Sequence, residues 1–236
     1  MLPLELKDVC FGVNGKVIID RVSVEIGAGP RTIILGPNGA GKSVLMRLCH
    51  GLLRPTGGAI VWRGNGGTGR PRRQAMVFQR PVMLRRSALA NIVYGLKLAG
   101  VARTERELRA RDVLDVVGLT DKSQQAARVL SGGEQQKLAL ARAWALGPEV
   151  LFLDEPTANL DPGATRELEA IVAAIRATGT KIIMTTHNLG QARRLGDEIL
   201  FLNQGRLVER APVDQFFRQP ASAEAAAFIR GELPWS

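Results

Sequence analysis

The sequence predicts an α/β fold built around a mixed, largely parallel sheet. Short apolar runs alternate along the chain with longer amphipathic stretches, a pattern typical of strands connected by helices. The run Val150–Leu153 is apolar throughout, as expected of a strand buried on both faces. The stretch Pro162–Ala177 has a helical pattern with proline in its first turn. Because 45% of the 236 residues are hydrophobic, the chain can bury a core and is not disordered.

The individual elements follow from local patterns. A helix is predicted over Lys42–His50, and residues 87–125 have a helical pattern throughout, broken at Gly100. Since this region lies between strands, we expect one domain, 1–236, with a core of about 1–86 and 146–236 and a helical insertion of about 87–145. Strands are predicted at Arg31–Leu35, Ala59–Trp62, Ala75–Phe78, Val150–Leu153, Lys181–Thr185 and Ile199–Leu202.

The charge of the chain is concentrated in its first half. The formal net charge is +10, and between Glu25 and Glu105 there are 13 basic residues and no acidic ones. A segment this basic favours an anionic neighbour, such as nucleic acid, nucleotide phosphates, an acidic protein surface or anionic lipid. A solvated arginine-rich surface is the alternative.

Several classes of protein are excluded by the sequence. The N-terminus MLPLELKDVCF lacks the basic start and apolar run of a signal peptide. No apolar run approaches the roughly 20 residues that span a bilayer. The two cysteines, Cys10 and Cys49, form no C-x-x-C pair, which argues against a disulfide scaffold or a thiolate zinc site. We expect both to be small buried hydrophobic residues.

The strongest local motif is GPNGAGKS, which matches the phosphate-binding pattern G-x-x-x-x-G-K-[ST] between a predicted strand and a predicted helix. Its glycines allow main-chain N–H groups to surround phosphates, and the helix N-terminus adds a positive dipole. Lys42 is expected on the β- and γ-phosphates, and the Ser43 hydroxyl on Mg²⁺. The expected nucleotide-binding residues are Gly36, Pro37, Asn38, Gly39, Ala40, Gly41, Lys42 and Ser43.

Two further motifs suit the same chemistry. The apolar strand Val150–Leu153 is followed by Asp154, a candidate Mg²⁺ ligand, and Glu155, a candidate general base for an attacking water. The sequence LSGGE provides an N-cap and capping-box pattern before a helix, and its glycines could expose N–H groups to a second phosphate. The residues of this second candidate site are Ser131, Gly132, Gly133 and Glu134.

Together, GPNGAGKS, LSGGE and the strand ending in Asp154 resemble the ATP-binding cassette (ABC) ATPases over essentially the whole chain. The resemblance implies a P-loop NTPase core, an N-terminal antiparallel β region and an inserted α-helical subdomain. It implies that Gln79 contacts Mg²⁺ and the attacking water, that Asp161 belongs to a nucleotide-contacting loop, and that His187 contacts the γ-phosphate. The catalytic residues implied are Lys42, Gln79, Glu155 and His187, and the metal ligands are Ser43, Gln79 and Asp154.

The sequence departs from this family at Val13, at Val44, where a second hydroxyl is frequent, and at Lys137, where arginine is frequent. The position where members commonly stack an aromatic residue on adenine aligns with Val13, and Phe11 lies two residues earlier. The resemblance therefore leaves two alternatives, in which Phe11 takes over the stacking or the contact with adenine is only apolar.

The resemblance also implies partners. Two copies of the chain would bind two ATP molecules head to tail, with the signature LSGGE of one copy completing the site of the other. Integral membrane permease subunits would contact the stretch QRPVMLRRS, in which Met83 and Leu84 lie among three arginines. The chain is then expected at the cytoplasmic face of a bacterial inner membrane, with a solute-binding protein as an indirect partner.

The transported solute is the least determined feature. FQRPVMLRRSALANIVYGL and FIRGELPW are similar to cassettes of oxyanion importers, particularly those for tungstate. Importers of phosphate or polar amino acids, an exporter ATPase with a separate membrane subunit, and an ABC ATPase acting on nucleic acid remain alternatives. No nucleic acid partner is expected, because paired cassettes and long coiled-coil insertions are absent from the sequence.

Overall fold

The computed structural model describes residues 2–65 and 73–232. The chain divides into two compact units, a first made of Met1–Arg72 with Lys181–Ser236 and a second made of Arg73–Thr180. The predicted insertion at 87–145 stays a prediction, because the compact unit that contains its helices extends further in both directions.

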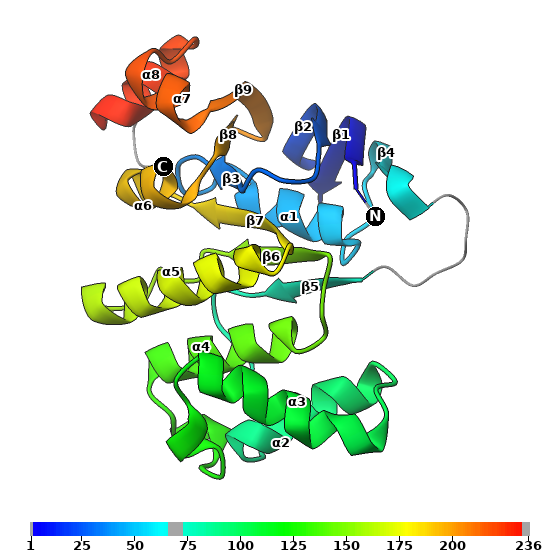
Figure 1. The fold of residues 1–236 in the computed structure, drawn as a ribbon. Helices are drawn as coiled ribbons and strands as arrows, with labels where there is room; N and C mark the ends of the chain where they lie inside the picture. The colour runs from blue at the N-terminus through cyan, green and yellow to red at the C-terminus, as the bar shows by residue number, and fades with distance from the viewer. Residues whose placement is uncertain (1, 66–72, 233–236) are drawn as a thin grey trace. The chain divides into compact units, whose positions relative to one another are not determined.

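The first unit is an α/β unit with two sheets (Figure 1). Its N-terminal sheet is antiparallel, with the order β2-β1-β4. In its mixed sheet, β3 pairs in parallel with β7 and β8, and β9 is antiparallel to β8. The strands are β1 (Leu4–Val13), β2 (Lys16–Ile26), β3 (Thr32–Leu35), β4 (Gly57–Trp62), β7 (Lys181–Thr186), β8 (Glu198–Asn203) and β9 (Arg206–Pro212).

The helices of this unit are short and follow the strands. They are α1 (Lys42–His50), α6 (Leu189–Leu195), α7 (Val213–Arg218), α8 (Ala223–Arg230) and the 3-10 turn η1 (Arg63–Asn65). The core lies along the central strand β3, whose four side chains are all buried, as expected of a parallel strand with both faces covered. The mixed sheet, the antiparallel N-terminal sheet and the helices confirm the predicted fold class.

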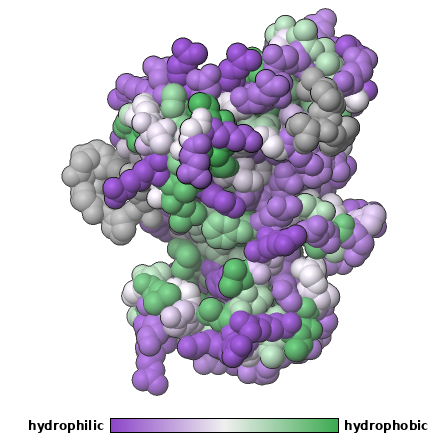
Figure 2. All heavy atoms as spheres, turned by 180° about the vertical axis from the view of Figure 1, so that it is seen from behind, coloured by the Kyte–Doolittle hydropathy of each residue, from purple (hydrophilic) through white to green (hydrophobic). Residues whose placement is uncertain are grey.

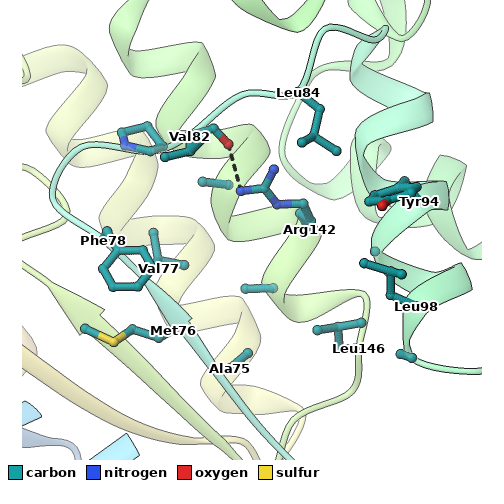
Figure 3. A pocket seen from close by; sticks show the side chains of 15 residues that line it. Ala75, Met76, Val77, Phe78, Val82, Leu84, Tyr94, Leu98, Arg142 and Leu146 are labelled. Carbon is teal, nitrogen blue, oxygen red and sulfur yellow. Dashed lines mark hydrogen bonds between the residues drawn. The ribbon is translucent and has the colours of Figure 1, made fainter. Parts of the chain in front are cut away.

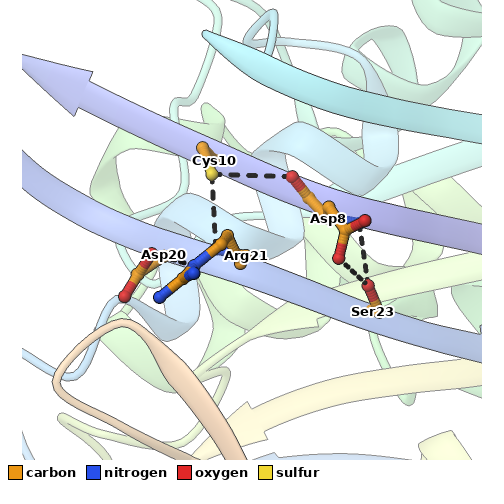
Figure 4. Close-up of polar contacts among 5 residues, drawn as sticks. All are labelled: Asp8, Cys10, Asp20, Arg21 and Ser23. Atoms are coloured by element: carbon orange, nitrogen blue, oxygen red, sulfur yellow. Dashed lines mark hydrogen bonds and ion pairs between the residues drawn. The ribbon is translucent and has the colours of Figure 1, made fainter.

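Two residues with positive φ lie where the pairing of β1 with β2 is irregular (Figure 4). Asp8 and Arg21 have φ values of +45° and +46°, and the register of β1 and β2 shifts around them. The Ser23 hydroxyl accepts a hydrogen bond from Asp8 N at 2.8 Å and donates to Asp8 Oδ1 at 2.9 Å. Cys10 is half-buried and its Sγ accepts from Arg21 N at 3.3 Å, so only Cys49 is the buried hydrophobic residue expected from the sequence.

The second unit contains the parallel strand pair β5 and β6 and a group of helices. Helix α4 contacts α2, α3 and α5 as well as β5. No helix in the described parts of the chain is both long and apolar enough to cross a membrane. The elements are β5 (Gln74–Val77), α2 (Ala88–Leu98), α3 (Arg103–Val116), η2 (Thr120–Lys122), η3 (Ala127–Val129), α4 (Gly132–Trp144), β6 (Val150–Asp154) and α5 (Pro162–Ala177).

The predicted helical stretch over residues 87–125 has its break at the right position, but the prediction extends the second helix too far. Gly100 has φ +78° and follows α2, as predicted. Helix α3 ends at Val116, because Gly118 takes φ +67°, and the chain continues in the 3-10 turn η2. Elements β9, α6, α7 and α8 were not predicted, since each has eight residues or fewer, too short for a clear periodic pattern.

Candidate functional site

The glycine-rich loop after β3 leads into α1 in the first unit. Gly41 is the N-cap of α1 with φ +97°, and a Cβ at this position would lie 2.8 Å from Ile19 Cδ1 and 3.0 Å from Ile18 O. Both the backbone conformation and the available space therefore require glycine. No side chain caps α1, and its first turn contains no acidic residue. The positive end of this helix dipole is therefore not offset by a carboxylate of its own first turn.

Lys42 is the buried charge of this loop. Its side chain is 5% exposed, and its Nζ donates to Gly36 O and Pro37 O, both at 2.9 Å. These bonds stabilise the turn of the loop and hold an ammonium group inside it. Gly36 is required by packing, because a Cβ would lie 2.0 Å from Leu202 O. Ala40 is buried, whereas the loop tip is exposed at Asn38 and Gly39.

His187 follows β7 in the same unit and faces the same loop. His187 and Pro37 line one cavity of about 190 Å³ together with Leu189 and the end of α8. One hydrogen bond spans the turn that carries His187, since Asn188 N donates to Thr186 Oγ1 at 3.0 Å. The first unit therefore brings together two of the segments predicted to contact phosphates.

The two predicted carboxylates lie in the second unit, where β6 ends. Asp154 is the last residue of β6 and is buried. Glu155 has φ +43°, a left-handed conformation that is uncommon for a residue other than glycine and costs about 1–3 kcal/mol. The turn is closed by Ala158 N, which donates to Glu155 O at 3.2 Å. The backbone is therefore strained at Glu155, the residue predicted to be the general base.

Three predicted segments meet at a second cavity within this unit. The cavity has a volume of about 250 Å³ and is lined by Gln79, by Gly132 at the start of α4, and by Pro156 and Asn159 after β6. Gln79 is exposed in the loop after β5. The loop carrying Gln79, the start of the signature helix and the turn after the carboxylates are therefore neighbours.

The signature segment forms the capping box that its sequence predicts. Ser131 Oγ accepts from Glu134 N at 3.3 Å, and Glu134 Oε2 accepts from Ser131 N at 2.9 Å. Lys122 forms an ion pair with the Glu134 carboxylate. The Lys122 ammonium and the Ser131 N–H hold the pKa of Glu134 below its usual value. Gly132 and Gly133 follow in the first turn of α4, and their predicted contact with a nucleotide stays a prediction.

Asp161 has a local structural role in the second unit. Its Oδ1 accepts from Gly163 N at 2.7 Å and from Ala164 N at 3.0 Å, which makes it the N-cap of α5. These N–H groups, that of Ala164 first, hold the pKa of the Asp161 carboxyl below its usual value. The predicted contact of Asp161 with nucleotide remains a prediction beside this cap.

Comparison with known proteins agrees with these motifs. The profile of the ABC transporter family matches residues 19–158, more than half of the chain. The chain belongs to the ABC transporter family. Members of this family bind and hydrolyse ATP, so this ABC chain is an ATPase.

Three curated relatives are similar to this ABC chain over most of its length. The phosphate import ATP-binding protein PstB 2 of Natronomonas pharaonis is 36% identical, covering 98% of this chain and 87% of the relative. The methionine import ATP-binding protein MetN of Nocardia farcinica is 37% identical, covering 92% and 68%. The tungstate uptake system ATP-binding protein TupC of Peptoclostridium acidaminophilum is 39% identical, covering 86% and 94%.

A solved structure has the same fold. The protein described as the ATP-binding subunit of an ABC transporter superposes with a TM-score of 0.81 at 26% identity, covering 98% of this chain and 99% of the other.

The candidate adenine contacts of the ABC chain lie on β1. Val13 is 47% exposed at the end of the strand, and Phe11 is half-buried two residues earlier. The exposed Val17 of β2 is paired with Gly12 across the hairpin, whereas Val13 is paired with Lys16. Sequence reasoning missed the exposed Val17, which the pairing of β1 with β2 places opposite Gly12. Contact of adenine with Phe11 or with Val13 stays a prediction, with both alternatives open.

Sequence reasoning also missed an apolar groove in the second unit (Figure 3). It has a volume of about 520 Å³ and lies between the loop after β5 and helices α2 and α4. Val82 and Leu98 line it and are each 70% exposed, with Phe78, Tyr94 and Arg142 beside them. Figure 2 shows hydrophobic side chains exposed among hydrophilic ones on the face it presents.

The position of Met83 does not favour the predicted contact of this side chain with a partner. Met83 is buried and packs into the unit, whereas its neighbour Val82 is exposed at the groove. Leu84 lines the groove, and its predicted contact with a partner stays a prediction. The signal in the sequence was the pattern of neighbouring apolar residues, which does not reveal which of them points outward in an irregular loop.

Proposed function

We propose that this chain is the ATP-hydrolysing subunit of an ABC importer. The observation that carries the proposal is the loop before α1, where Lys42 places a buried ammonium beside a helix N-terminus that no side chain caps. Such a helix end with an adjacent cation binds phosphate groups. The importer assignment rests on relatives named for import of phosphate, methionine and tungstate.

The residues present fit the phosphates of ATP and Mg²⁺. The exposed loop tip and the first turn of α1 contain no carboxylate that would repel phosphates. Ser43, Asp154 and Gln79 offer hydroxyl, carboxylate and amide oxygens, the donor types that Mg²⁺ prefers. When bound, Mg²⁺ neutralises phosphate charge.

The side chains of the chain itself perform the remaining tasks. Lys42 stabilises negative charge on the phosphates, and the Glu155 carboxylate accepts a proton from the attacking water. His187 contacts the γ-phosphate, and Gln79 orients the water. The signature segment, residues 131–134, acts on nucleotide held by a second copy of the chain, in a symmetric head-to-tail dimer.

Substitution of Glu155 by Gln tests the hydrolytic proposal. The amide keeps the shape of the side chain but cannot accept the proton, so we expect ATP binding to persist while turnover falls by about 10²–10⁴-fold. Phosphate release and equilibrium binding of a fluorescent ATP analogue measure the two effects. Size-exclusion chromatography with ATP is expected to show a stable dimer of the variant. Turnover at the wild-type rate would remove Glu155 from the role of general base.

The apolar groove of the second unit is the surface we assign to the permease. Val82 and Leu98 are exposed apolar side chains there, flanked by the arginine-rich loop that the sequence singled out. Docking on a permease would place the chain peripherally at the cytoplasmic face of the membrane. Replacing Leu98 by Asp is expected to abolish co-purification with the permease, whereas Leu108→Asp, at another exposed leucine, is the matched control.

For the cargo we propose a tetrahedral oxyanion, with tungstate as the first choice. Its support is the 39% identity to the tungstate relative together with the similarity to the phosphate relative. The C-terminal part of the supporting motif, from Leu233 on, lies outside the described residues. The assay reconstitutes the ATPase with its permease and measures stimulation by a solute-binding protein loaded with tungstate, phosphate or methionine. Stimulation by methionine alone would overturn the oxyanion assignment.

A further inference from the structure

The loop that follows β5 is held in place mainly by side chains. We name residues 79–87 the coupling segment; it begins at Gln79 and ends at Ser87, the N-cap of α2. The segment belongs to no helix or strand. Since main-chain carbonyls in such a loop need partners, the groups that bind them decide where the loop lies.

Three side chains each donate to one main-chain carbonyl at the start of this loop or within it. Gln136 Nε2 donates to the carbonyl of Phe78, directly before Gln79, at 3.4 Å. Arg142 Nη2 donates to the carbonyl of Val82 at 3.0 Å (Figure 3). Arg128 Nε donates to Met83 O at 3.2 Å. The donors come from α4 and η3, so the helices fix the loop on one side.

Asn91 of α2 fixes the remainder of the coupling segment. Its side chain is fully buried, and its Oδ1 accepts from Leu84 N at 3.0 Å. Its Nδ2 donates to Ser87 O at 2.9 Å and to Arg86 O at 3.3 Å. Arg142 Nη1 also donates to Asn91 Oδ1, at 3.4 Å. Arg142 therefore links the Val82 carbonyl to the amide that holds the second half of the segment.

The position of Arg142 in the apolar groove strengthens this link. Burial lowers the pKa of the Arg142 guanidinium, so the side chain is partly removed from water. A partly desolvated cation needs hydrogen-bond acceptors, and the carbonyl and amide oxygens supply them. Gly95 of α2 lies beside the Arg142 side chain, since a Cβ there would be in van der Waals contact with Arg142 Cγ, at 3.4 Å.

From these contacts we infer that Arg142 is a positioning residue that fixes the coupling segment and, through it, Gln79. The inference rests on the proposed function, in which Gln79 acts in ATP hydrolysis. Arg142 lies on the wall of the groove, and its acceptor Val82 is exposed there. A partner that occupies the groove therefore contacts the residues that set the position of the loop.

The test compares Arg142→Met and Arg142→Lys with the wild type in two ways. Hydrogen exchange is expected to be at least tenfold faster at the amides of residues 79–87 in Arg142→Met, and intermediate in Arg142→Lys, which keeps a charge but not the two-pronged geometry. The control is Arg111→Gln, which removes an exposed arginine paired with Glu107 on α3 and is expected to change neither exchange in the segment nor ATP hydrolysis. Unchanged exchange in Arg142→Met would overturn the inference.

The kinetic test separates positioning from general destabilisation. In Arg142→Met we expect kcat to fall about ten- to hundredfold at constant KM for ATP, because a displaced Gln79 impairs the reaction. Combined with Gln79→Ala, the Arg142→Met substitution is expected to have no further effect on kcat. Multiplied effects in the double variant would mean that Arg142 acts independently of Gln79 and would overturn the inference.

The two proposals fail in different ways. A wild-type chain that does not hydrolyse ATP would contradict the proposed function, while hydrogen exchange would still measure whether Arg142 fixes the loop. A hydrolysing wild type with unchanged exchange in Arg142→Met would contradict only the positioning role. If Arg142→Met does not fold, Arg142→Lys gives the same comparison at smaller amplitude.

Discussion

Two helices of this chain begin at glycine-rich segments, and their N-termini differ in capping. Helix α1 begins at Gly41 without a side-chain cap and without an acidic residue in its first turn. Helix α4 begins at Ser131 with a complete capping box, and Glu134 is also paired with Lys122. The first helix keeps its positive end for a ligand, whereas the second satisfies part of its own N-terminus.

This difference shows that glycine content alone does not define a phosphate site. Both segments have a local sequence suited to phosphate, yet only α1 has an adjacent buried ammonium, that of Lys42. The capping box stabilises the start of α4, and the contact of Gly132 and Gly133 with nucleotide on a second copy of the chain stays a proposal. We therefore expect substitutions at α1 to affect nucleotide binding and substitutions at α4 to affect stability and turnover of the dimer.

The largest effect is expected for Lys42→Met. Loss of the ammonium removes the charge that faces the phosphates, so ATP affinity is expected to fall at least about tenfold and hydrolysis about 10²-fold or more. Isothermal titration with ATP and phosphate release measure the two quantities. Unchanged ATP affinity would show that the uncapped α1 is not the phosphate site.

A pH-dependent stability difference is expected from Lys181 in the first unit. Burial lowers the pKa of Lys181 to about 8, although Glu198 and Asp197 oppose the shift. Between about pH 8 and 10.5 the unfolded chain retains a proton that the folded chain has released, so stability rises with pH in this range. The gain is on the order of 1–2 kcal/mol once solvent access is allowed for.

Urea unfolding of wild type and Lys181→Met from pH 7 to pH 10.5 measures the Lys181 effect. The difference in unfolding free energy between the two proteins is expected to move in favour of the wild type as pH rises. A difference that is constant with pH would contradict the lowered pKa.

A smaller effect is expected for Ser131→Ala at the capped helix. Loss of the Ser131 hydroxyl removes one half of the capping box, which costs about 1 kcal/mol of unfolding free energy. Affinity of the single chain for ATP is expected to stay unchanged, because α1 lies elsewhere in the sequence and keeps its own residues. Chemical denaturation and ATP titration give the two results. A loss of ATP affinity without a loss of stability would show that Ser131 serves nucleotide binding in the single chain and does not stabilise the helix.

The smallest effect is expected at acidic pH from Glu134. Because its pKa is lowered by Lys122 and the Ser131 N–H, its contribution is present above the pKa of the unfolded chain and is lost as pH falls below it. Lys122→Met is expected to weaken this acid dependence slightly, since the ion pair is exposed to solvent. Acid titration of unfolding by circular dichroism compares the two proteins, and identical profiles would show that Lys122 does not stabilise the cap.

Much of the fold could be predicted because the relevant signals are local. The helix Lys42–His50 has the same bounds in the structure as in the prediction, and β6 differs only by including Asp154. The end of α3 was misplaced, because Gly118 acts through its left-handed backbone and not through a change in the apolar pattern. The capping box at Ser131 was also predicted, since its partners are only three residues apart.

The sequence by itself determined the glycine-rich loop before α1, the two carboxylates where β6 ends and the α/β class, because each depends on residues that are neighbours along the chain. Only the tertiary structure revealed the apolar groove and the bonds from Arg142 and Asn91 to the coupling segment. The bond from Arg142 to Val82 joins residues that are 60 positions apart, and Asn91 binds an irregular loop seven positions away, at Leu84. No local pattern encodes such pairs, because the packing of the helices decides which carbonyl a long side chain can reach.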